Sequence, residues 1–522
     1  MVIIIAMKWL WTAILLYIII FGAVTSLRHY NFQTQTWDMG IFTQIMWNIT
    51  KGNGAVGTLE FVHNHFAVHM SPILFLLAPG YMAFQSPYFL LIVQTLALAL
   101  GAWPLFLLAR KVLNLGSPNS LGSRTSQKLA LTIAIAYLLY PSLNWVNWFD
   151  FHPIAFLAPA FLAAFYFAEA GQWRWMSLFL ILAASAQEDA VLVVAFFGIY
   201  LMIKDAGRPQ DVRRRYVGIT IFILSTAYFL LATKLIMPYF GGGLLRLDRY
   251  AHLGGSFLEI AKNLFIHPSL FISTVFQWQK LVYLFWLFLP VVFLPILAPR
   301  ELILLIPGLA QNLFTNYAPQ FAGAYQYDSA LIAGIFIAVV YGLEKAISIF
   351  AFLAPPSERG SGWRSGPPPT FAFGEVGDRA RAARQTRKNA NRLPILILIV
   401  APLLALLIRS PISPFNFPIE LFKTNPRAET FRKILNIVPQ NASVAAHTNL
   451  VPHIAHREKI FMLGLEPTEP ADLPDIVIMD GADYFGFGTP EMFEQYAQKY
   501  ASSDKYNATI VDDRYYILTR KK

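Results

Sequence analysis

Asp38 lies early in the sequence, directly after Trp37 and before a run of mostly apolar residues. Burial beside apolar side chains raises the pKa of a carboxyl group and suits it to take a proton from a hydroxyl group. The same carboxylate could instead cap a helix that begins at Met39. Asp38 is therefore a candidate general base, and Gln44, farther along the same polar loop, is a candidate substrate contact.

His65 and His69 stand at positions i and i+4 of the same loop. On a helix, this spacing places both imidazole rings on one face, where they could bind a divalent metal ion. A loop at the membrane interface that binds no metal explains the two residues equally well. A divalent metal ion is thus the one cofactor that the sequence suggests, and no residue pattern requires it.

A second acid and histidine, Asp150 and His152, come just before Pro153. Proline fits the first turn of a helix, which places His152 at the helix cap. In an extended approach to that helix, residues two positions apart point the same way, so the two side chains would lie together. Asp150 is predicted to be catalytic and His152 to bind substrate. The alternative is a pair of ordinary polar residues at the membrane interface.

Glu188 and Asp189 follow an apolar stretch, residues 175–186, that would span only about 18 Å as a helix. This length is shorter than a bilayer core, so the sequence predicts a broken helix pair with the two acids at its outward tip. Ionisable groups at membrane depth are costly and usually serve a site or a pathway. Both acids are predicted to be catalytic, and a purely structural pair is the alternative.

Arg246 and Arg249 follow three consecutive glycines at 241–243. A guanidinium group in a glycine-hinged loop could hold a phosphate group, and a solvated loop is the alternative. Tyr327 opens a later apolar stretch at the same predicted level and could line the same cavity. These three residues are predicted to bind substrate.

The composition assigns these residues to a membrane protein. Hydrophobic residues make up 56% of the 522 residues and charged residues only 14%, whereas a soluble protein carries about a quarter charged residues. The chain has no cysteine, which excludes disulfides and thiolate metal sites. The net charge of +11 lies in short loops between apolar stretches, and it therefore indicates membrane orientation and no nucleic-acid partner.

Basic loops orient the predicted helices. They lie at 110–128, 204–215 and 355–392, and the positive-inside rule places all of them in the cytoplasm. The last loop is also rich in proline and glycine and is predicted to be disordered. This assignment places the N-terminus in the cytoplasm and a first external loop at 27–71.

The predicted fold class is mainly α, a polytopic transmembrane bundle with a small α/β domain at its C-terminus. About eleven membrane helices fit within residues 1–408, at roughly 20 residues a helix. Short apolar runs then alternate with helix-like stretches, so residues 409–522 are predicted to form a soluble α/β domain outside the cytoplasm. The turn at Asp512-Asp513 is predicted to join a terminal hairpin.

Several of these residues belong to short motifs that resemble a known group of proteins. The motifs are Trp37-Asp38-Met39-Gly40, His65-Phe66 with Ser71-Pro72, Phe151-His152-Pro153, Glu188-Asp189 and the segment 449–457. They resemble an uncharacterised prokaryotic family of polytopic membrane proteins near the GT-C superfamily of lipid-dependent glycosyltransferases. That superfamily includes protein O-mannosyltransferases and the aminoarabinose transferases of lipid A. The resemblance covers most of the chain and implies a place in the prokaryotic plasma membrane.

The resemblance also implies roles for the acids. Asp38 matches the early-loop acid that acts as catalytic base in GT-C enzymes, and Asp150 falls where those enzymes often place a second acid. Glu188 and Asp189 fall near a tip where mannosyltransferase-like members often carry lysine, so the charge is reversed here. The two acids would then hold a metal ion with a histidine, or orient an acceptor.

The implied function is transfer of a sugar from a polyprenyl-phosphate donor in the membrane to a hydroxyl group on the extracytoplasmic face. The acceptor would be a glycan, lipid or protein that the sequence does not identify. One alternative is a transporter or flippase of a lipid-linked sugar, which needs a polar pathway to the cytoplasm, yet the inner halves of the predicted helices carry few ionisable residues. The other alternative is a non-catalytic scaffold or sensor.

Overall fold

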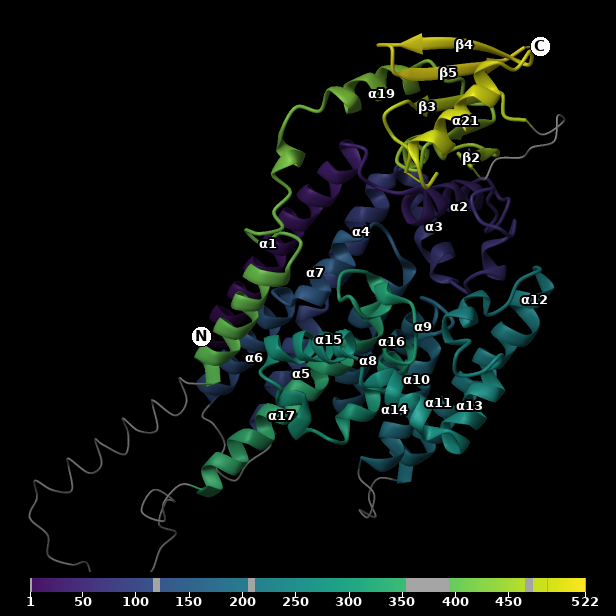
Figure 1. Ribbon diagram of the computed structural model, residues 1–522. Helices are drawn as coiled ribbons and strands as arrows, with labels where there is room; N and C mark the ends of the chain where they lie inside the picture. Colours follow the sequence, from purple (N-terminus) through teal and green to yellow (C-terminus); the bar gives the residue numbers. More distant parts are fainter. Residues whose placement is uncertain are drawn as a thin grey trace, which may run out of the picture.

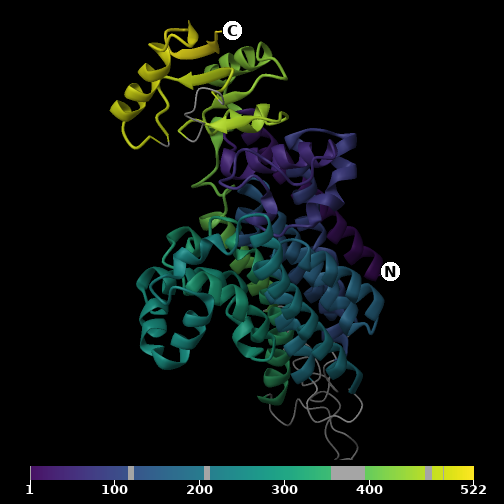
Figure 2. The same ribbon diagram turned by 90° about the vertical axis from the view of Figure 1, so that its right-hand side faces the viewer.

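The computed structural model describes residues 2–115, 123–204, 212–353, 394–464, 473–485 and 487–521. The chain is mainly helical, and a five-stranded sheet lies near its C-terminus. The sheet and its helices sit at one end of the helical bundle, over α2 and α3 (Figure 1; Figure 2). The loop predicted to be disordered, 355–392, lies outside the described residues, and this prediction stays untested.

The helices of the bundle follow one another along the chain with connections of very different length. They are α1 (Val2–Tyr30), α2 (Ile41–Thr50), α3 (Ile73–Ala83), α4 (Pro87–Leu100), α5 (Ala102–Leu115), α6 (Ser123–Leu138), α7 (Pro141–Trp148), α8 (Leu157–Glu169), α9 (Trp173–Ala184), α10 (Ala190–Ile203), α11 (Val212–Leu231), α12 (Met237–Tyr239), α13 (Phe257–Ile266), α14 (Pro268–Val275), α15 (Trp278–Phe288), α16 (Ile306–Leu313) and α17 (Ser329–Leu353). A further helix spans Pro394–Arg409.

Four helical stretches in the described part of the chain are long and apolar enough to cross a membrane: Ile3–Tyr30, Pro87–Leu113, Val212–Tyr239 and Gln326–Ile349. The stretch Arg124–Leu138 and α7, bent by 42° at their break, would together make a fifth. The bend falls where Pro141 begins α7, because proline cannot donate the hydrogen bond that would continue the preceding helix.

Shorter apolar helices of 10–17 residues complete the bundle. They are Ile73–Ala83, Pro153–Glu169, Trp173–Ala184, Ala190–Ile203, Trp278–Val291, Glu301–Leu313 and Pro394–Arg409. Length and composition do not decide how many of these short helices cross the membrane. The number of about eleven crossings therefore stays a prediction.

Glycine lets α10 and α11 approach closely. A Cβ atom on Gly198 would lie 2.7 Å from the carbonyl oxygen of Gly218, and a Cβ atom on Gly218 would lie 2.6 Å from that of Gly198. Membrane helices gain little from burying apolar surface against each other, because lipid is as apolar as the helices. Close backbone packing at small residues takes over this role, and it holds α10 against α11.

The C-terminal unit is a mixed sheet with helices on it. Its elements are α19 (Pro426–Asn436), β1 (Val444–Ala446), α20 (Val451–Ile454), β2 (Ile460–Met462), β3 (Ile476–Asp480), α21 (Pro490–Ala501), β4 (Tyr506–Val511) and β5 (Tyr515–Arg520). The strand order is β2-β1-β3-β5-β4, with β1 parallel to β2 and β3, and β5 antiparallel to β3 and β4. The turn between β4 and β5 is made by Asp512 and Asp513, both with positive φ (53° and 50°), so the predicted hairpin is confirmed.

The sheet unit and the first loop share one hydrophobic core. Met39 and Phe42 of the loop belong to the same buried cluster as Val451 and Ile478 of the sheet unit. A Cβ atom on Gly40 would come within 3.0 Å of the Val451 side chain, so the loop backbone lies directly against α20. The boundary predicted at 408/409 stays untested, because these two parts are packed together as one body.

Hydrogen bonds across this contact fix its register. The Thr36 amide donates to the Thr448 hydroxyl at 3.0 Å, and the Thr36 hydroxyl donates back to the Thr448 carbonyl at 2.8 Å. The fully buried Gln44 amide donates to the carbonyl oxygens of Arg457 and Glu458 at 3.2 and 3.1 Å. Its Oε1 accepts from the Thr58 amide at 2.9 Å. Gln44 thus ties the first loop to the sheet unit.

Replacement of Gln44 by leucine is expected to loosen this contact. The Gln44→Leu change removes the partners of two carbonyl oxygens and one amide, and each buried polar group left unsatisfied costs about 1–3 kcal/mol. Thermal unfolding in detergent and limited proteolysis would report a lower melting temperature and faster cleavage between the sheet unit and the bundle. The matched control is Gln495→Leu, on the exposed face of α21. Equal melting temperatures for the two variants would contradict the assignment.

Candidate functional site

Asp38 and His152 meet, although they are far apart in the sequence. Asp38 lies in a π-helical turn, Thr36–Gly40, that leads into α2, and its Oδ1 is 2.7 Å from Nε2 of His152. The Asp38 side chain is 19% exposed and that of His152 is 7% exposed. Gly40 is the residue that caps α2, so Asp38 does not serve as its cap. The structure leaves Asp38 as a carboxylate at the surface, backed by a buried imidazole.

His152 is held by its own chain neighbours as the sequence predicts. It caps the 3-10 helix Pro153–Phe156, with Pro153 in the first turn. Its Nδ1 is buried and has no hydrogen-bond partner among the described residues. With Nε2 protonated, the ring donates to Asp38 and orients that carboxylate.

Asp150 lies behind this pair. It is 1% exposed, its Oδ1 is 3.2 Å from Nη1 of Arg28, and its Oδ2 accepts from the Gln35 amide at 2.8 Å. Arg28 also donates to the carbonyl oxygen of Trp148. Burial raises the pKa of the Asp150 carboxyl group, while the guanidinium of Arg28 opposes the rise. The contact holds the residues that lead into the Asp38 turn, so Asp150 positions Asp38.

Gln94 is a member of the site that the sequence analysis missed. It is fully buried in α4, donates to the carbonyl oxygen of Asp150 at 2.7 Å, and accepts from the His152 amide at 2.8 Å. The one available signal was a polar side chain inside an apolar helix, which is costly in a membrane unless it serves a purpose. Gln94 sets the distance between the loop that carries His152 and the bundle.

The broken tip between α9 and α10 contacts the first loop. Glu188 accepts from Nδ1 of His69 at 2.9 Å and from the Met70 amide at 2.9 Å. Burial acts to raise the pKa of Glu188, but the His69 ring and these hydrogen bonds outweigh it and leave that pKa below its usual range. Burial likewise acts to lower the pKa of His69, and Glu188 reverses this and raises it. At any pH between the lowered pKa of Glu188 and the raised pKa of His69, both side chains are charged and form an ion pair.

Asp189 belongs to a second chain of contacts. Its Oδ2 accepts from Nε2 of Gln311 at 2.9 Å, and its Oδ1 is buried without a hydrogen-bond partner among the described residues. Burial and the neighbouring charge of Glu188 raise the pKa of Asp189 to about 6. The carbonyl oxygen of Gln311 accepts from the Tyr250 hydroxyl at 2.8 Å. This hydrogen bond extends the series of contacts to the loop that contains Arg249.

Arg249 lies at the other end of this series of hydrogen bonds. Its Nη1 lies 3.2 Å from Oε1 of Gln320 and 3.4 Å from the Tyr327 hydroxyl. Its guanidinium stacks on the Tyr317 ring at 4.0 Å, a cation–π contact. No carboxylate among the described residues forms an ion pair with Arg249, so its charge is available to an anion. Arg246, one turn earlier, is exposed and has no hydrogen bond or ion pair in the described part of the chain.

Aromatic side chains connect Arg249 with the Asp38–His152 pair. The His152 ring stacks on Phe149 at 5.5 Å, Phe149 meets Tyr325 edge to face at 4.7 Å, and Tyr325 lies 6.3 Å from Tyr327. Tyr327 is also within electrostatic reach of Asp38. The structure thus brings a carboxylate to the same aromatic-lined region as a guanidinium that has no ion-pair partner among the described residues.

The two loop histidines do not share a helix, which corrects the geometry assumed for a metal site. Only a short 3-10 turn, His65–Ala67, is formed, and the ring centroids of His65 and His69 are 6.2 Å apart. Each Nδ1 pairs with a different carboxylate, that of Glu60 for His65 and that of Glu188 for His69. Among the described residues, no group of three or more histidine, aspartate or glutamate side chains could hold a metal ion.

Gln44, predicted to contact substrate, is buried and occupied by the contacts described above. The substrate-binding role therefore stays a prediction that our proposal does not need.

Comparison with solved structures shows which fold these elements make. The crystal structure of ArnT from Cupriavidus metallidurans bound to undecaprenyl phosphate aligns with a TM-score of 0.51 at 12% identity, covering 97% of each chain. The apo form of the same protein aligns with a TM-score of 0.48 at 13% identity, covering 96% of this chain and 97% of that one. No curated protein sequence matches.

The bundle and the sheet unit therefore have the fold of ArnT, which confirms the expected resemblance at the level of the fold. The chain itself belongs to the family described as predicted membrane protein DUF2079, whose match spans residues 28–519.

The His69–Glu188 pair predicts a pH window for stability. The raised pKa of His69 stabilises the fold below its unfolded value of 6.5, and this contribution is lost as pH rises through the higher folded pKa. The lowered pKa of Glu188 stabilises the fold above 4.5, and this contribution is lost as pH falls through the lower folded pKa. The melting temperature of wild type should therefore exceed that of Glu188→Gln by most between pH 4.5 and 6.5.

Melting curves across pH 4–9 would measure this difference, with Glu494→Gln, an exposed change on α21, as the control. A difference in melting temperature that is the same at every pH would contradict the ion pair. The same pH-dependent difference in the control variant would also contradict it.

Proposed function

We propose that this protein is a membrane glycosyltransferase that moves a sugar from a polyprenyl-phosphate donor to an acceptor hydroxyl group. The observation that carries the proposal is the Asp38–His152 contact, a partly exposed carboxylate oriented by a buried imidazole and connected by aromatic rings to Arg249. The ArnT structure with the same fold binds undecaprenyl phosphate, which supports a donor of this class.

In this proposal, Asp38 is the general base. The acceptor hydroxyl gives its proton to the free Asp38 carboxylate oxygen while its own oxygen attacks the anomeric carbon. His152 donates to the other oxygen and keeps the carboxylate in place. The bond between the anomeric carbon and the phosphate oxygen breaks, and attack from the side opposite the phosphate inverts the configuration.

The leaving group in this proposal is a polyprenyl phosphate, which departs with the bonding electron pair and gains negative charge. Arg249 would accept it, because guanidinium binds phosphate through two parallel hydrogen bonds. The stack on Tyr317 and the contact with Gln320 hold the guanidinium ready. Electrostatic stabilisation of charge that develops in the transition state is usually the largest single contribution to catalysis.

Asp150, Glu188 and Asp189 take supporting parts in this proposal. Asp150 holds the turn of Asp38 through the Gln35 amide. Glu188 joins the first loop to the broken tip, and Asp189 carries that connection to Gln311. We assign none of these three acids to proton transfer, because Asp150 and Glu188 are buried and ion-paired and Asp189 is part-buried and accepts from Gln311.

The base is tested by Asp38→Asn. Purified protein would be given radiolabelled sugars on polyprenyl-phosphate carriers, and transfer to membrane glycans, lipids or proteins would be measured. General-base catalysis contributes about 10²- to 10⁴-fold, so Asp38→Asn should lower the rate by that factor. Asp248→Asn, which changes an exposed carboxylate in the turn Leu245–Tyr250, should leave the rate unchanged. Equal rates in Asp38→Asn and wild type would overturn this role for Asp38.

The donor contact is tested by the paired variants Arg249→Gln and Arg246→Gln. They remove the same charge one helical turn apart, and only Arg249 faces the aromatic region. Loss of a hydrogen bond to a charged group costs about 1.5–3 kcal/mol, so Arg249→Gln should raise the KM for donor roughly 10- to 100-fold. Arg246→Gln should leave it unchanged. A larger effect of Arg246→Gln would move the phosphate to that residue.

A further inference from the structure

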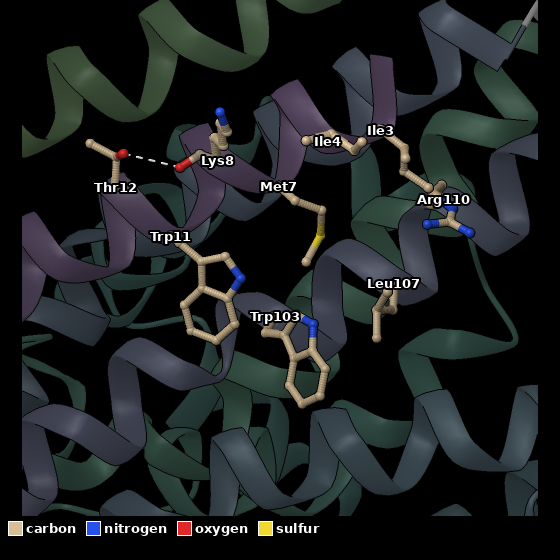
Figure 3. A pocket seen from close by; sticks show the side chains of 9 residues that line it. All are labelled: Ile3, Ile4, Met7, Lys8, Trp11, Thr12, Trp103, Leu107 and Arg110. Atoms are coloured by element: carbon tan, nitrogen blue, oxygen red, sulfur yellow. Dashed lines mark hydrogen bonds between the residues drawn. The ribbon is translucent and has the colours of Figure 1, made fainter. Parts of the chain in front are cut away.

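A second candidate site lies away from Asp38, between the first helix and α5. Ile3, Ile4, Met7, Lys8, Trp11 and Thr12 of α1 face Trp103, Leu107 and Arg110 of α5 around an open hollow of about 780 Å³ (Figure 3). The hollow lies at the end of α1 near the N-terminus, whereas the Asp38 turn follows the other end of this helix. It is therefore separate from the site proposed above.

The hollow is apolar along its length and charged at one end. Trp103, Leu107 and Arg110 follow one another on one face of α5 at helical spacing (Figure 3). At 1.5 Å a residue, about 10 Å separate the indole of Trp103 from the level of Arg110. The Trp11 and Trp103 rings lie 6.2 Å apart and are inclined by 36°. The amino group of Lys8 points away from these two rings (Figure 3).

The charge of Arg110 has no partner among the residues that the structure describes. In the described part of the chain it forms no ion pair and no hydrogen bond, although it is half-buried beside apolar side chains. An unpaired charge at the edge of a bilayer is costly unless it meets water or an anion. A guanidinium group favours a phosphate because the two are complementary in shape and charge.

The surroundings favour an occupant from the membrane. The neighbouring face of α1 exposes Ile5, Trp9, Leu15 and Ile19, which places the hollow on a surface made for lipid. Tryptophan side chains are enriched where the hydrocarbon core meets the headgroups, and basic residues near the ends of membrane helices attract anionic lipids. An acyl chain matches the apolar length, and a phosphodiester matches the charged end.

We propose that this groove binds one anionic phospholipid, with an acyl chain between α1 and α5 along Met7 and Leu107 and with its phosphodiester on Arg110. The lipid would fill the space between these two helices and cover the Trp11 and Trp103 side chains, which are 43% and 42% exposed. The occupant is a lipid of the bilayer itself and does not take part in sugar transfer.

Lipid binding can be measured by quenching of tryptophan fluorescence. The full-length protein in detergent would be titrated with phosphatidylglycerol or phosphatidylcholine that carry the same brominated acyl chain. The wild type should bind phosphatidylglycerol about fivefold more tightly, which is the preference expected from one basic residue at a membrane surface. Trp11→Phe with Trp103→Phe should remove the part of the quenching that depends on these two indoles, which locates the bound chain.

Arg110→Gln should abolish the preference, and Lys111→Gln is the matched control. The control removes the same charge at the same level of α5, from a side chain that does not line the hollow. Leu107→Phe provides a second test. It narrows the hollow and should weaken the binding of both lipids, while the charge of Arg110 remains. Equal binding of the two lipids by wild type would overturn the proposal. Equal effects of Arg110→Gln and Lys111→Gln on the lipid preference would also overturn the proposal, since the preference would then come from the general positive charge of the surface.

Discussion

The buried contact between Arg28 and Asp150 joins the two segments from which the Asp38 site is built. Arg28 ends the first helix, and Asp150 lies in the loop after α7. Removing one partner of a buried charge pair leaves the other uncompensated, which usually costs several kcal/mol. The pair also accounts for the positive φ of 45° at Asp150, because this backbone conformation turns the carboxylate towards Arg28 and the Gln35 amide. Asp38 lies three residues after Gln35 in this anchored stretch, so its place depends on the pair.

A buried cation elsewhere in the bundle obeys the same constraint, since lipid offers it no hydrogen bonds. Lys280 is fully buried, and its ammonium group donates to the carbonyl oxygens of Thr274, Leu313 and Thr315 at 2.7–2.9 Å. All its protons are used, so this lysine closes the ends of neighbouring helices. The contrast with Arg249 and Arg110 is informative, because those two cations keep hydrogen-bonding capacity that the protein does not use.

Sequence reasoning identified most of the side chains of the site and few of their partners. Asp38 and His152 were both singled out, but as members of different loops, because 114 positions separate them and no local pattern encodes a contact of that range. Glu188 was expected to act with Asp189, yet its partner is His69. The strands of the sheet unit and its hairpin were predictable from short alternating runs and paired aspartates. The number of membrane crossings was harder to predict, because a short apolar helix can lie at several depths in a bilayer.

The shared core of the first loop and the sheet unit has a consequence for how the chain is made. Thr36 and Thr448 are 412 residues apart, so ribosomes that add roughly 5–20 residues a second need about 20–80 s to supply the second partner after the first. During this interval Met39 and Phe42, which end fully buried, have no sheet to cover them. The nascent loop must wait, shielded by lipid or by a chaperone. Any pause in translation before the sheet unit lengthens the time during which the loop can aggregate.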